Sequence, residues 1–463
     1  MADPRETLEQ SQSGSAAHGE REAVPGLVLV LAAGRPVVEP IPMTGGQVEL
    51  GRDHSAFIEH PDPRLSRRHA AVHFDGQCFM ATDLGSRNGT AADGEALRPE
   101  APREVTRVLR AGRSLLVPAR DITPFERAGV RVAGGRVEGP ALKDALAAAA
   151  NAAKLGSILH ITGESGAGKE GLARAFHAAG PAPNGPFQAV NCATIPEGVA
   201  ERLLFGAKRG AYSGADADAE GYVQAAHGGT LFLDEVAELS LAVQAKLLRV
   251  LETGEVLPLG AARPRKVDLR LCSATHRDLR AQVALGKLRE DLFFRIATPR
   301  VIAPPLRDRP EEIPFLLELE VERTAPGLSV HASLVEAALL RPWPGNVREL
   351  LAEARSAAQA AVAAGSSRVE ATHLSATAGC AFQTPAEPAP LEPARAPPAI
   401  TPPAGTPPPP PPPRARIAGL LKRVGGNVSA AARELGVHRT QLRRWMERYG
   451  LDARSFAAPR DED

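Results

Sequence analysis

The sequence of 463 residues has few of the features that stabilise secreted or membrane proteins. Its four cysteines are scattered, so neither a disulfide framework nor a zinc-ligand motif follows from them. The longest apolar runs are too short to cross a membrane, and the first twenty residues lack the layout of a signal peptide. We therefore expect a reducing, cytoplasmic location.

Net charge is also nearly absent, at +1, but the charge is unevenly distributed. Residues 414–450 contain nine Lys and Arg against two Glu, so this segment alone carries +7. Such a short basic segment is typical of one that binds a polyanion. The length of 463 residues exceeds that of a single core and predicts about three domains.

Composition divides the chain into segments. Residues 1–23 are small and polar, which indicates a disordered tail. Residues 24–124 contain short β-like runs separated by Gly, Pro and Asp turns, which predicts an all-β sandwich. From 136 to 305 helical patterns alternate with buried strands, which predicts an α/β core with a parallel sheet. Residues 306–365 follow as a helical piece.

The remaining segments are a spacer and a basic tail. Residues 366–413 are interpreted as a Pro-rich linker, because 15 of the 29 residues from 385 to 413 are proline. Residues 414–455 show apolar stripes at helical spacing, with a short turn at Gly436 and Val437. Three helices with this spacing predict an all-α helix-turn-helix.

A glycine-rich segment, GESGAGKE at 163–170, lies between an apolar strand and a helical pattern. Glycines there allow backbone N–H groups to close around the phosphates of ATP at a helix N-terminus, with Lys169 against the β and γ phosphates. Glu170 stands where such loops usually carry a hydroxyl ligand to Mg²⁺. The expected ATP-binding residues of this loop are Gly163, Glu164, Ser165, Gly166, Ala167, Gly168, Lys169 and Glu170.

An apolar strand that ends in two carboxylates follows at 228–235, with the sequence GGTLFLDE. Asp234 would hold Mg²⁺ through water, and Glu235 would orient and polarise the attacking water. Either motif alone could be a plain turn or a buried strand capped by surface acids. Both in this order indicate ATP hydrolysis.

Eight motifs share one order between residues 136 and 365: GESGAGKE, NCA, GAYSGA, GGTLFLDE, SATHRDL, LREDLFFRI, PPLRDRPEEI and WPGNVREL. Together they resemble the AAA+ central domain of sigma-54-dependent enhancer-binding proteins, in which glutamate after the P-loop lysine is normal. The resemblance makes 136–305 the AAA+ core and 306–365 its helical lid. It implies a hexamer or heptamer ring that hydrolyses ATP with Mg²⁺ to remodel RNA polymerase carrying sigma-54.

The resemblance also assigns residues around the nucleotide, by matching motif. Asn191 resembles the asparagine that holds Glu235 in an inactive pose until the γ-phosphate is sensed. Thr275 and His276 occupy the first sensor, and Arg348 resembles the second sensor.

Two arginines and one loop are expected to act on other molecules. Arg289 and Arg295 resemble arginine fingers that reach the γ-phosphate of a neighbouring subunit. GAYSGA resembles the GAFTGA loop that contacts sigma-54, with Tyr212 for Phe and Ser213 for Thr, after Ala-Lys-Arg in place of His-Glu-Lys at 207–209. The expected sigma-54 contacts are Gly210, Ala211, Tyr212, Ser213, Gly214 and Ala215.

Within residues 24–124, the segments LGRD (50–53), RLSRRHA (64–70) and DLGSRNGT (83–90) resemble a forkhead-associated (FHA) domain. This β-sandwich binds phosphothreonine peptides. Charge-assisted hydrogen bonds to phosphate and one contact to the peptide backbone are expected from Arg52, Ser66, Arg67 and Asn88. A phosphothreonine-containing protein or a Ser/Thr kinase is the implied partner, and its binding is expected to switch ring assembly.

The basic tail resembles the Fis-type domain that ends many enhancer-binding proteins, through GGNVSAAARELGVHRTQLRRWMERYGL. Burial of the last apolar stripe leaves polar residues that can face upstream, enhancer-like DNA: Arg439, Thr440, Gln441, Arg443, Arg444 and Arg448. A basic hairpin that mediates oligomerisation is the simpler alternative.

Two other interpretations of the whole chain stay open. The protein could be a DNA-binding regulator or repressor whose nucleotide site controls assembly without polymerase remodelling. It could also be a phosphopeptide scaffold for which ATP turnover is dispensable. Open-complex formation tests the first alternative, and a Lys169→Ala variant tests the second.

Overall fold

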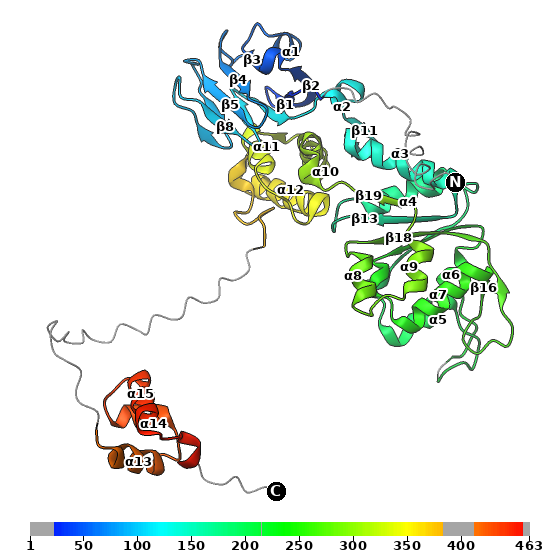
Figure 1. The fold of residues 1–463 in the computed structure, drawn as a ribbon. Coiled ribbons are helices and arrows are strands. Elements are labelled where there is room, and N and C mark those ends of the chain that lie inside the picture. Colours follow the sequence, from blue (N-terminus) through cyan, green and yellow to red (C-terminus); the bar gives the residue numbers. More distant parts are fainter. Residues whose placement is uncertain (1–22, 214, 383–411, 457–463) are drawn as a thin grey trace, which may run out of the picture. The chain divides into compact units, whose positions relative to one another are not determined.

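The computed structural model describes residues 23–213, 215–382 and 412–456. The chain divides into two compact units, one up to Gln383 and one from Thr384 (Figure 1). The expected N-terminal tail, apart from Ala23, and most of the Pro-rich segment lie outside the described residues. Among the described residues, no helix is both long and apolar enough to span a membrane.

The first unit begins with a sandwich of two antiparallel sheets, as predicted. One sheet has the order β2-β1-β10-β9-β6-β7, with β1 (Gly26–Ala32), β2 (Arg35–Pro42), β6 (Thr90–Ala92), β7 (Glu95–Ala96), β9 (Leu109–Ala111) and β10 (Ser114–Ala119). The other has the order β3-β4-β5-β8, with β3 (Gln47–Leu50), β4 (Ala70–Phe74), β5 (Phe79–Asp83) and β8 (Arg103–Val105). Helix α1 (Ser55–Glu59) follows β3.

Strand β1 is buried along its whole length, and its two faces contact different cores. Leu27 and Leu29 point between the two sheets, whereas Val28 and Val30 point outward. Successive side chains of a strand point to opposite faces, so a strand with apolar residues on both must be covered on both. The outward face is covered by the helical lid described below.

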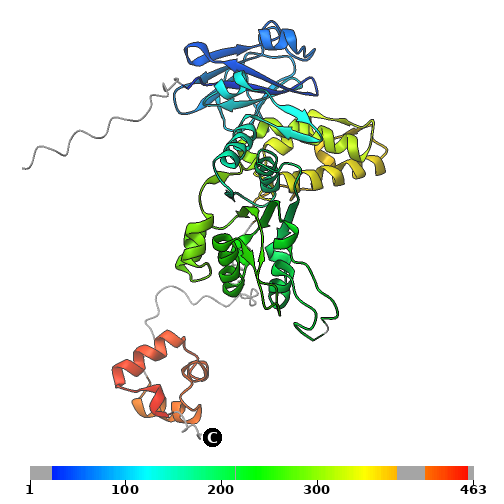
Figure 2. The ribbon, with the colours of Figure 1, turned by 90° about the vertical axis from the view of Figure 1, so that its right-hand side faces the viewer.

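The predicted α/β core contains a five-stranded parallel sheet in the order β14-β15-β18-β13-β19, which confirms the predicted fold class. Its strands are β13 (Ile158–Thr162), β14 (Phe187–Asn191), β15 (Gly229–Asp234), β18 (Leu269–Thr275) and β19 (Arg300–Ile302). Helices α3 (Pro140–Leu155) and α4 (Lys169–Ala178) cover one face. The other face is covered by α5 (Glu197–Phe205), α6 (Tyr222–Ala225), α7 (Leu241–Thr253), α8 (Leu279–Ala284) and α9 (Glu290–Ile296) (Figure 2). Parallel pairing brings the carboxyl ends of β13, β15 and β18 to one edge.

The lid consists of α10 (Ile313–Thr324), α11 (Ala332–Leu339) and α12 (Asn346–Ala363). It also includes residues assigned above to the linker. Strand β20 (Ser329–Val330) pairs with β21 (Arg368–Val369), and Val369, Leu374 and Ala378 are buried in the lid core. The predicted start of the linker at 366 is therefore wrong, because the segment 366–379 packs on the lid through these buried residues.

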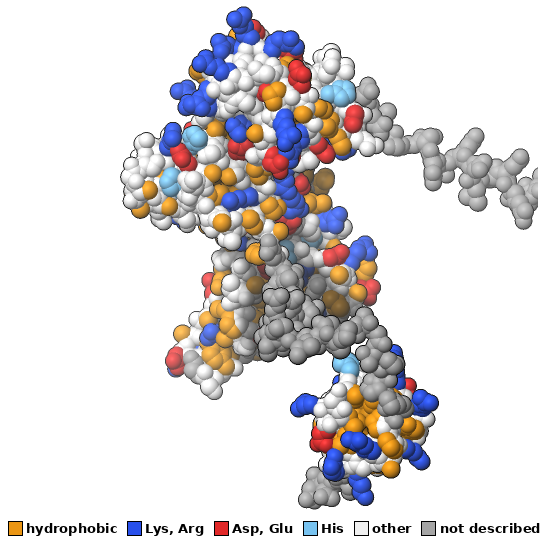
Figure 3. Space-filling view, turned by 90° about the vertical axis from the view of Figure 1, so that its left-hand side faces the viewer, with side chains coloured by type: hydrophobic (Ala, Val, Ile, Leu, Met, Phe, Trp, Pro, Cys, Tyr) orange, Lys and Arg blue, Asp and Glu red, His pale blue; other side chains and the backbone are white. Residues whose placement is uncertain are grey.

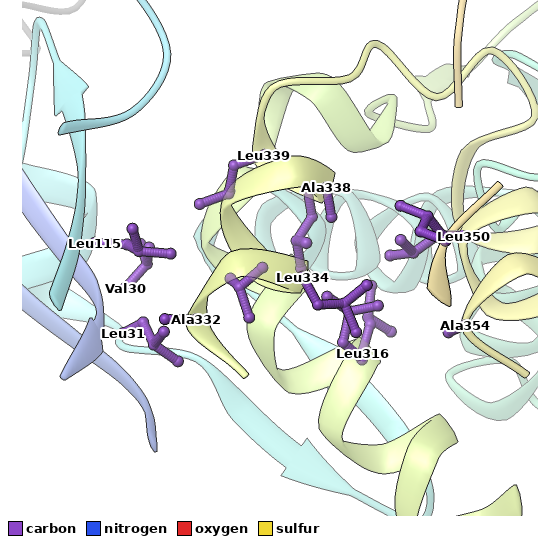
Figure 4. Packing of buried hydrophobic residues seen from close by; sticks show 14 of the residues in the cluster. Val30, Leu31, Leu115, Leu316, Ala332, Leu334, Ala338, Leu339, Leu350 and Ala354 are labelled. Atoms are coloured by element: carbon purple, nitrogen blue, oxygen red, sulfur yellow. The ribbon is translucent and has the colours of Figure 1, made fainter. Parts of the chain in front are cut away.

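The sandwich and the lid share one apolar core (Figure 4). The chain between them forms α2 (Thr123–Arg127), β11 (Arg131–Ala133) and β12 (Arg136–Glu138). Val30 and Leu115 of the sandwich belong to the same buried cluster as Leu339 of α11. At the edge of this contact, Arg110 Nε lies 3.0 Å from a carboxylate oxygen of Glu336. These contacts place the sandwich on the lid.

The second unit contains α13 (Arg414–Arg423), α14 (Val428–Glu434) and α15 (Arg439–Tyr449) around a small apolar core. Asn427 is the N-cap of α14, and its side chain accepts hydrogen bonds from Ser429 N and Ala430 N. Gly436 adopts φ +65° in the turn between α14 and α15, a left-handed conformation that favours glycine.

Candidate functional site

A cleft of about 540 Å³ opens at the carboxyl edge of the parallel sheet, between the core and the lid. The segment Ser165–Glu170 forms one wall, and Asn191, Asp234, Glu235 and Arg348 lie around it. Gly166 and Gly168 adopt left-handed φ values of +74° and +100°. This conformation shapes the loop at the N-terminus of α4, where backbone N–H groups and the helix dipole favour an anion.

Lys169 lies inside this cleft, and only 7% of its side chain is exposed. Its Nζ donates to the carbonyl oxygens of Gly163 (3.0 Å) and Glu164 (3.3 Å) and lies 3.5 Å from Glu235 Oε1. A buried lysine fixed in this way presents a localised positive charge to a phosphate chain.

Glu235 follows β15 in a left-handed conformation with φ +53°. Its Oε2 accepts hydrogen bonds from Thr275 Oγ1 (3.1 Å), His276 N (3.3 Å) and His276 Nδ1 (2.8 Å). Burial tends to raise the pKa of Glu235, but the bond from His276 and the charge of Lys169 outweigh it and lower the pKa. Burial raises the pKa of Asp234 beside it, with the charge of Glu235 adding to the effect.

Thr275 and His276, the predicted first-sensor residues, contact Glu235, whereas Asn191 does not. The side chain of Asn191 lines the cleft, yet its Oδ1 accepts from Ala193 N at 3.0 Å and caps a short 3₁₀ turn. Glu235 is held instead by Thr275 and His276. The pairing of Asn191 with Glu235 is absent from this conformation of the described residues.

The lid closes the cleft through three side chains. Arg348 Nη1 donates to Ser165 Oγ at 3.1 Å. Asn346 is buried and donates to Glu164 Oε2 at 3.0 Å, and Arg307 makes a two-pronged ion pair with the same carboxylate at 2.7 and 2.9 Å. Sequence reasoning missed Asn346 and Arg307 as partners of the loop. Both nevertheless lie inside matched motifs, which was the available signal.

Two predicted residues lie outside the cleft. Arg289 pairs with Asp291 at 2.7 Å, and Arg295 donates to Leu251 O at 2.9 Å. Both are exposed near Phe294, a large apolar side chain that is 69% exposed on α9. Neither arginine lines the cleft of its own chain.

The GAYSGA loop projects between α5 and α6, beside the turn between β16 (Glu255–Val256) and β17 (Arg265–Lys266) (Figure 1). Lys208 belongs to the Ala-Lys-Arg segment at 207–209, which differs from the His-Glu-Lys of the family, and it pairs with Asp218. The Tyr212 ring lies against Arg202, 5.2 Å from the guanidinium carbon to the ring centroid, and its hydroxyl accepts from Arg202 at 2.7 Å. Gly214 lies outside the described residues.

The sandwich carries its four candidate residues on three neighbouring loops, which follow β3, α1 and β5. Arg52 donates to Leu65 O at 2.9 Å, and Asn88 Nδ2 donates to Arg64 O at 2.7 Å. Ser66 Oγ accepts from Arg87 N at 3.0 Å. Arg52, Arg67 and Asn88 are exposed and Ser66 is half-buried, so the polar ends of these loops face solvent together.

In the second unit the candidate DNA contacts lie along α15. Arg439, Arg443, Arg444 and Arg448 are exposed, and Gln441 is half-buried. Lys and Arg side chains surround this unit in Figure 3. The hydroxyl of Thr440 lies 2.8 Å from His438 Nδ1 at the helix N-cap, so it is partly engaged within the protein.

Three family models match the chain in order. They are described as FHA domain (residues 48–112), Sigma-54 interaction domain (136–301) and Bacterial regulatory protein, Fis family (414–449). The chain therefore combines an FHA domain, a Sigma-54 interaction domain and a Fis-family domain in this order.

The chain is also similar in sequence to known transcriptional regulators. The chain is 40% identical over 296 residues to the hydrogenase transcriptional regulatory protein HoxA of Bradyrhizobium diazoefficiens, covering 63% of this chain and 59% of that one. It is 44% identical over 218 residues to the DNA-binding transcriptional regulator NtrC of Escherichia coli, covering 46% of each. The chain therefore spans about half the length of the relatives it matches. Among solved structures, NtrX from Brucella abortus in complex with ATP is 30% identical, with 70% of each chain covered and a TM-score of 0.48. Residues 136–301 thus match the Sigma-54 interaction domain, and the relatives that the chain matches are transcriptional regulators.

Proposed function

We propose that this protein is a transcriptional activator that hydrolyses ATP to remodel sigma-54 RNA polymerase. One observation carries the proposal: Lys169 and Glu235 lie 3.5 Å apart in a cleft closed by Arg348, with Thr275 and His276 holding the Glu235 carboxylate. A phosphate-binding lysine beside an ionised, fixed carboxylate suits hydrolysis of a phosphoanhydride by water. The match of residues 136–301 to the Sigma-54 interaction domain supports sigma-54 RNA polymerase as the target.

The cleft supports one division of roles. The backbone of 163–170 and Lys169 bind the phosphates, and Glu235 orients and polarises the attacking water. Thr275 and His276 keep Glu235 ionised and in place. Arg348 links the position of the lid to the nucleotide site, because this lid residue contacts Ser165 of the phosphate-binding loop.

Asp234 is the proposed Mg²⁺ residue, and the donor set fits that ion. Asp234 and Glu235 are both carboxylates in the cleft, and burial raises the pKa of Asp234, a penalty that a nearby cation would offset. When bound, Mg²⁺ would neutralise charge on the phosphates. Glu170 is exposed and pairs with Arg174 at 2.6 Å, so it is not placed as a metal residue.

Arg289 and Arg295 are proposed to act on the ATP of a neighbouring subunit in a hexamer or heptamer. Their exposure outside their own cleft supports this role. Two inactive variants test it. Glu235→Gln removes the carboxylate and Arg295→Ala removes the guanidinium, and each alone should lower phosphate release about 100-fold or more.

Mixing these two variants should restore part of the activity, because a mixed ring pairs an intact Glu235 with an intact Arg295 across some interfaces. Glu235→Gln mixed with Lys169→Ala is the matched control. It should stay inactive, because every cleft of that ring lacks a required residue. Failure of the first mixture to recover any phosphate release would contradict action in trans.

Polymerase remodelling is proposed for the loop 210–215, and upstream DNA binding for Arg439, Thr440, Gln441, Arg443, Arg444 and Arg448. The test is open-complex formation by the purified chain with sigma-54 holoenzyme and supercoiled promoter DNA, with ATP or a non-hydrolysable analogue. ATP hydrolysis without open complexes would favour the alternative, a regulator or repressor whose nucleotide controls assembly. The pairing of Tyr212 with Arg202 is the observation that favours this alternative.

Phosphothreonine-peptide binding by the sandwich is proposed as the regulatory input. Arg52, Ser66 and Arg67 would donate to the phosphate and Asn88 would hold the peptide backbone. Their common exposure on adjoining loops supports the proposal. Binding of a phosphopeptide to the full chain, and its loss in Arg52→Gln, is the corresponding test.

A further inference from the structure

The loop that carries Ser66 is fixed against the turn between β9 and β10. Asp62 Oδ1 accepts from Arg64 N at 2.9 Å, while Oδ2 accepts from Arg113 N at 2.7 Å and from Ser114 Oγ at 2.9 Å. Asp62 is only 2% exposed, so these bonds are shielded from water. Arg64 and Arg113 are therefore held beside each other, next to the proposed phosphate site.

The lid reaches the sandwich at the same turn. Strand β10 begins at Ser114, and its next residue, Leu115, belongs to the core shared with α11. Figure 4 shows Leu115 and Leu31 of the sandwich facing the lid helix that carries Ala332 and Leu339. The start of α11 is thus placed close to the β9–β10 turn.

His331 is the N-cap of α11 and lies where the lid contacts the sandwich. Burial lowers the pKa of His331 most, and the charges of Arg368, Arg113 and Arg64 lower it further, against the opposing charge of Glu370. Such charge effects act over short distances at a half-buried site. The backbone geometry agrees for the lid arginine, because His331 N donates to the carbonyl of Val369, the residue after Arg368, at 2.9 Å.

The surface formed by Arg64, Arg113, His331 and Arg368, here called the joint surface, is basic. The three arginines are exposed. Asp62, the acidic residue beside Arg64 and Arg113, is buried, and Glu370 pairs with Arg368 at 2.5 Å. Figure 3 shows Lys and Arg side chains gathered over the sandwich end of the first unit. Two arginines of the joint surface remain without an ion pair in the described residues.

We propose that a phosphothreonine peptide lies across both the sandwich loops and the joint surface, and that acidic residues flanking the phosphothreonine contact Arg64, Arg113 and Arg368. The partner is therefore an acidic phosphopeptide, and the lid contributes directly to its selection. Three extended residues span roughly 10 Å, enough to leave the phosphate site and reach the neighbouring turn. This inference rests on the proposed phosphothreonine site at Ser66.

The experiment measures fluorescence anisotropy of three labelled peptides with the full chain. One peptide carries phosphothreonine with Asp and Glu on both sides, the second carries Asn and Gln in their place, and the third is the acidic peptide without phosphate. The acidic phosphopeptide should bind roughly tenfold more tightly than the neutral one at low ionic strength, and 0.5 M NaCl should narrow the difference.

Two variants locate the preference. Arg113→Gln in the sandwich and Arg368→Gln in the lid should each reduce the acidic preference about threefold, without removing the dependence on phosphate. Arg120→Gln is the matched control. Arg120 is an exposed arginine just past the far end of β10, and its removal should leave the preference unchanged.

The outcomes separate this inference from the function on which it rests. If phosphate makes no difference to binding, the phosphothreonine site itself fails and the inference fails with it. If binding depends on phosphate but is equal for acidic and neutral flanks, only the joint surface is overturned. If Arg113→Gln acts and Arg368→Gln does not, the surface ends at the sandwich and the role of the lid is overturned.

Discussion

The carboxylate of Glu235 is held from two directions, by Thr275 and His276 on one side and by Lys169 on the other. Its proposed role in hydrolysis requires the ionised form, so ATPase activity should be lost as pH falls through the pKa of Glu235. Because the contacts lower this pKa, the loss is expected below the usual range of a glutamate.

Replacement of His276 by Ala should therefore shift the acidic limb of the ATPase profile. Without the bond from His276 the pKa of Glu235 rises, so activity begins to fall at a higher pH than in the wild type. Phosphate release measured across the pH range tests this. His73→Ala, at an exposed position of the sandwich, should leave the limb unmoved. An unchanged limb in His276→Ala would show that His276 does not set the ionisation of Glu235.

Tyr212 differs from the family phenylalanine by one hydroxyl, and that hydroxyl accepts from Arg202. In Tyr212→Phe this bond is lost and only the contact between the ring and Arg202 remains, so the ring is held less tightly and is more available for the proposed contact with sigma-54. We expect open-complex formation to rise by up to about fivefold, the effect of one hydrogen bond of about 1 kcal/mol. The ATPase rate without polymerase should not change. A fall in open complexes would assign the hydroxyl itself to the polymerase contact.

Some site residues could be predicted from the sequence and others could not. Lys169, Asp234 and Glu235 follow strands whose apolar runs are visible, so the edge where they meet could be foreseen. The partners of the loop could not, because Asn346 and Arg307 come from segments more than 140 positions away. Which side chain contacts which across such a distance depends on packing rather than on spacing.

Among the elements, residues 366–382 differ most from expectation. Their Ala, Ser, Thr and Gly content is typical of a linker, and no apolar period distinguishes them. Their structure depends on tertiary contacts, because Val369 and Leu374 fill gaps in the lid and Gly379 lies under the ring of Trp343. The sandwich strands and the P-loop helix, in contrast, carry local patterns strong enough to be identified without a structure.

Gly379→Ala tests whether this segment stabilises the lid. A Cβ at this position would lie 2.6 Å from atoms of the Trp343 ring, and the backbone has φ +64°. Gly365→Ala is a matched control with φ +66° and no atom within 4 Å of the added Cβ. The control should lose about 1 kcal/mol and Gly379→Ala about 2–4 kcal/mol in chemical unfolding. Equal losses of unfolding free energy in the two variants would mean that the Trp343 ring moves aside for the added Cβ and that the segment adds little to the stability of the lid.

At the scale of the first unit, the shared core makes the sandwich and the lid interdependent. Leu339→Asp buries a charge where α11 meets the sandwich, whereas Val362→Asp changes a side chain on α12 that is 54% exposed. We expect Leu339→Asp to lower the unfolding free energy by about 3–5 kcal/mol and Val362→Asp by less than about 0.5 kcal/mol. Calorimetry should show the sandwich and lid melting in one transition. Separate transitions in the wild type would contradict a common core.

The outward face of β1 also bears on how the regulatory part can be removed by genetic truncation. A chain that starts after residue 130 would lack the loops proposed to bind the phosphopeptide. It would also leave Ala332, Leu339 and their neighbours on the lid exposed to solvent. Poor solubility of such a fragment would then result from the exposed apolar surface of the lid and not from the loss of phosphopeptide binding. Point changes in the loops, with the sandwich left in position, are the cleaner way to ask what the input domain does.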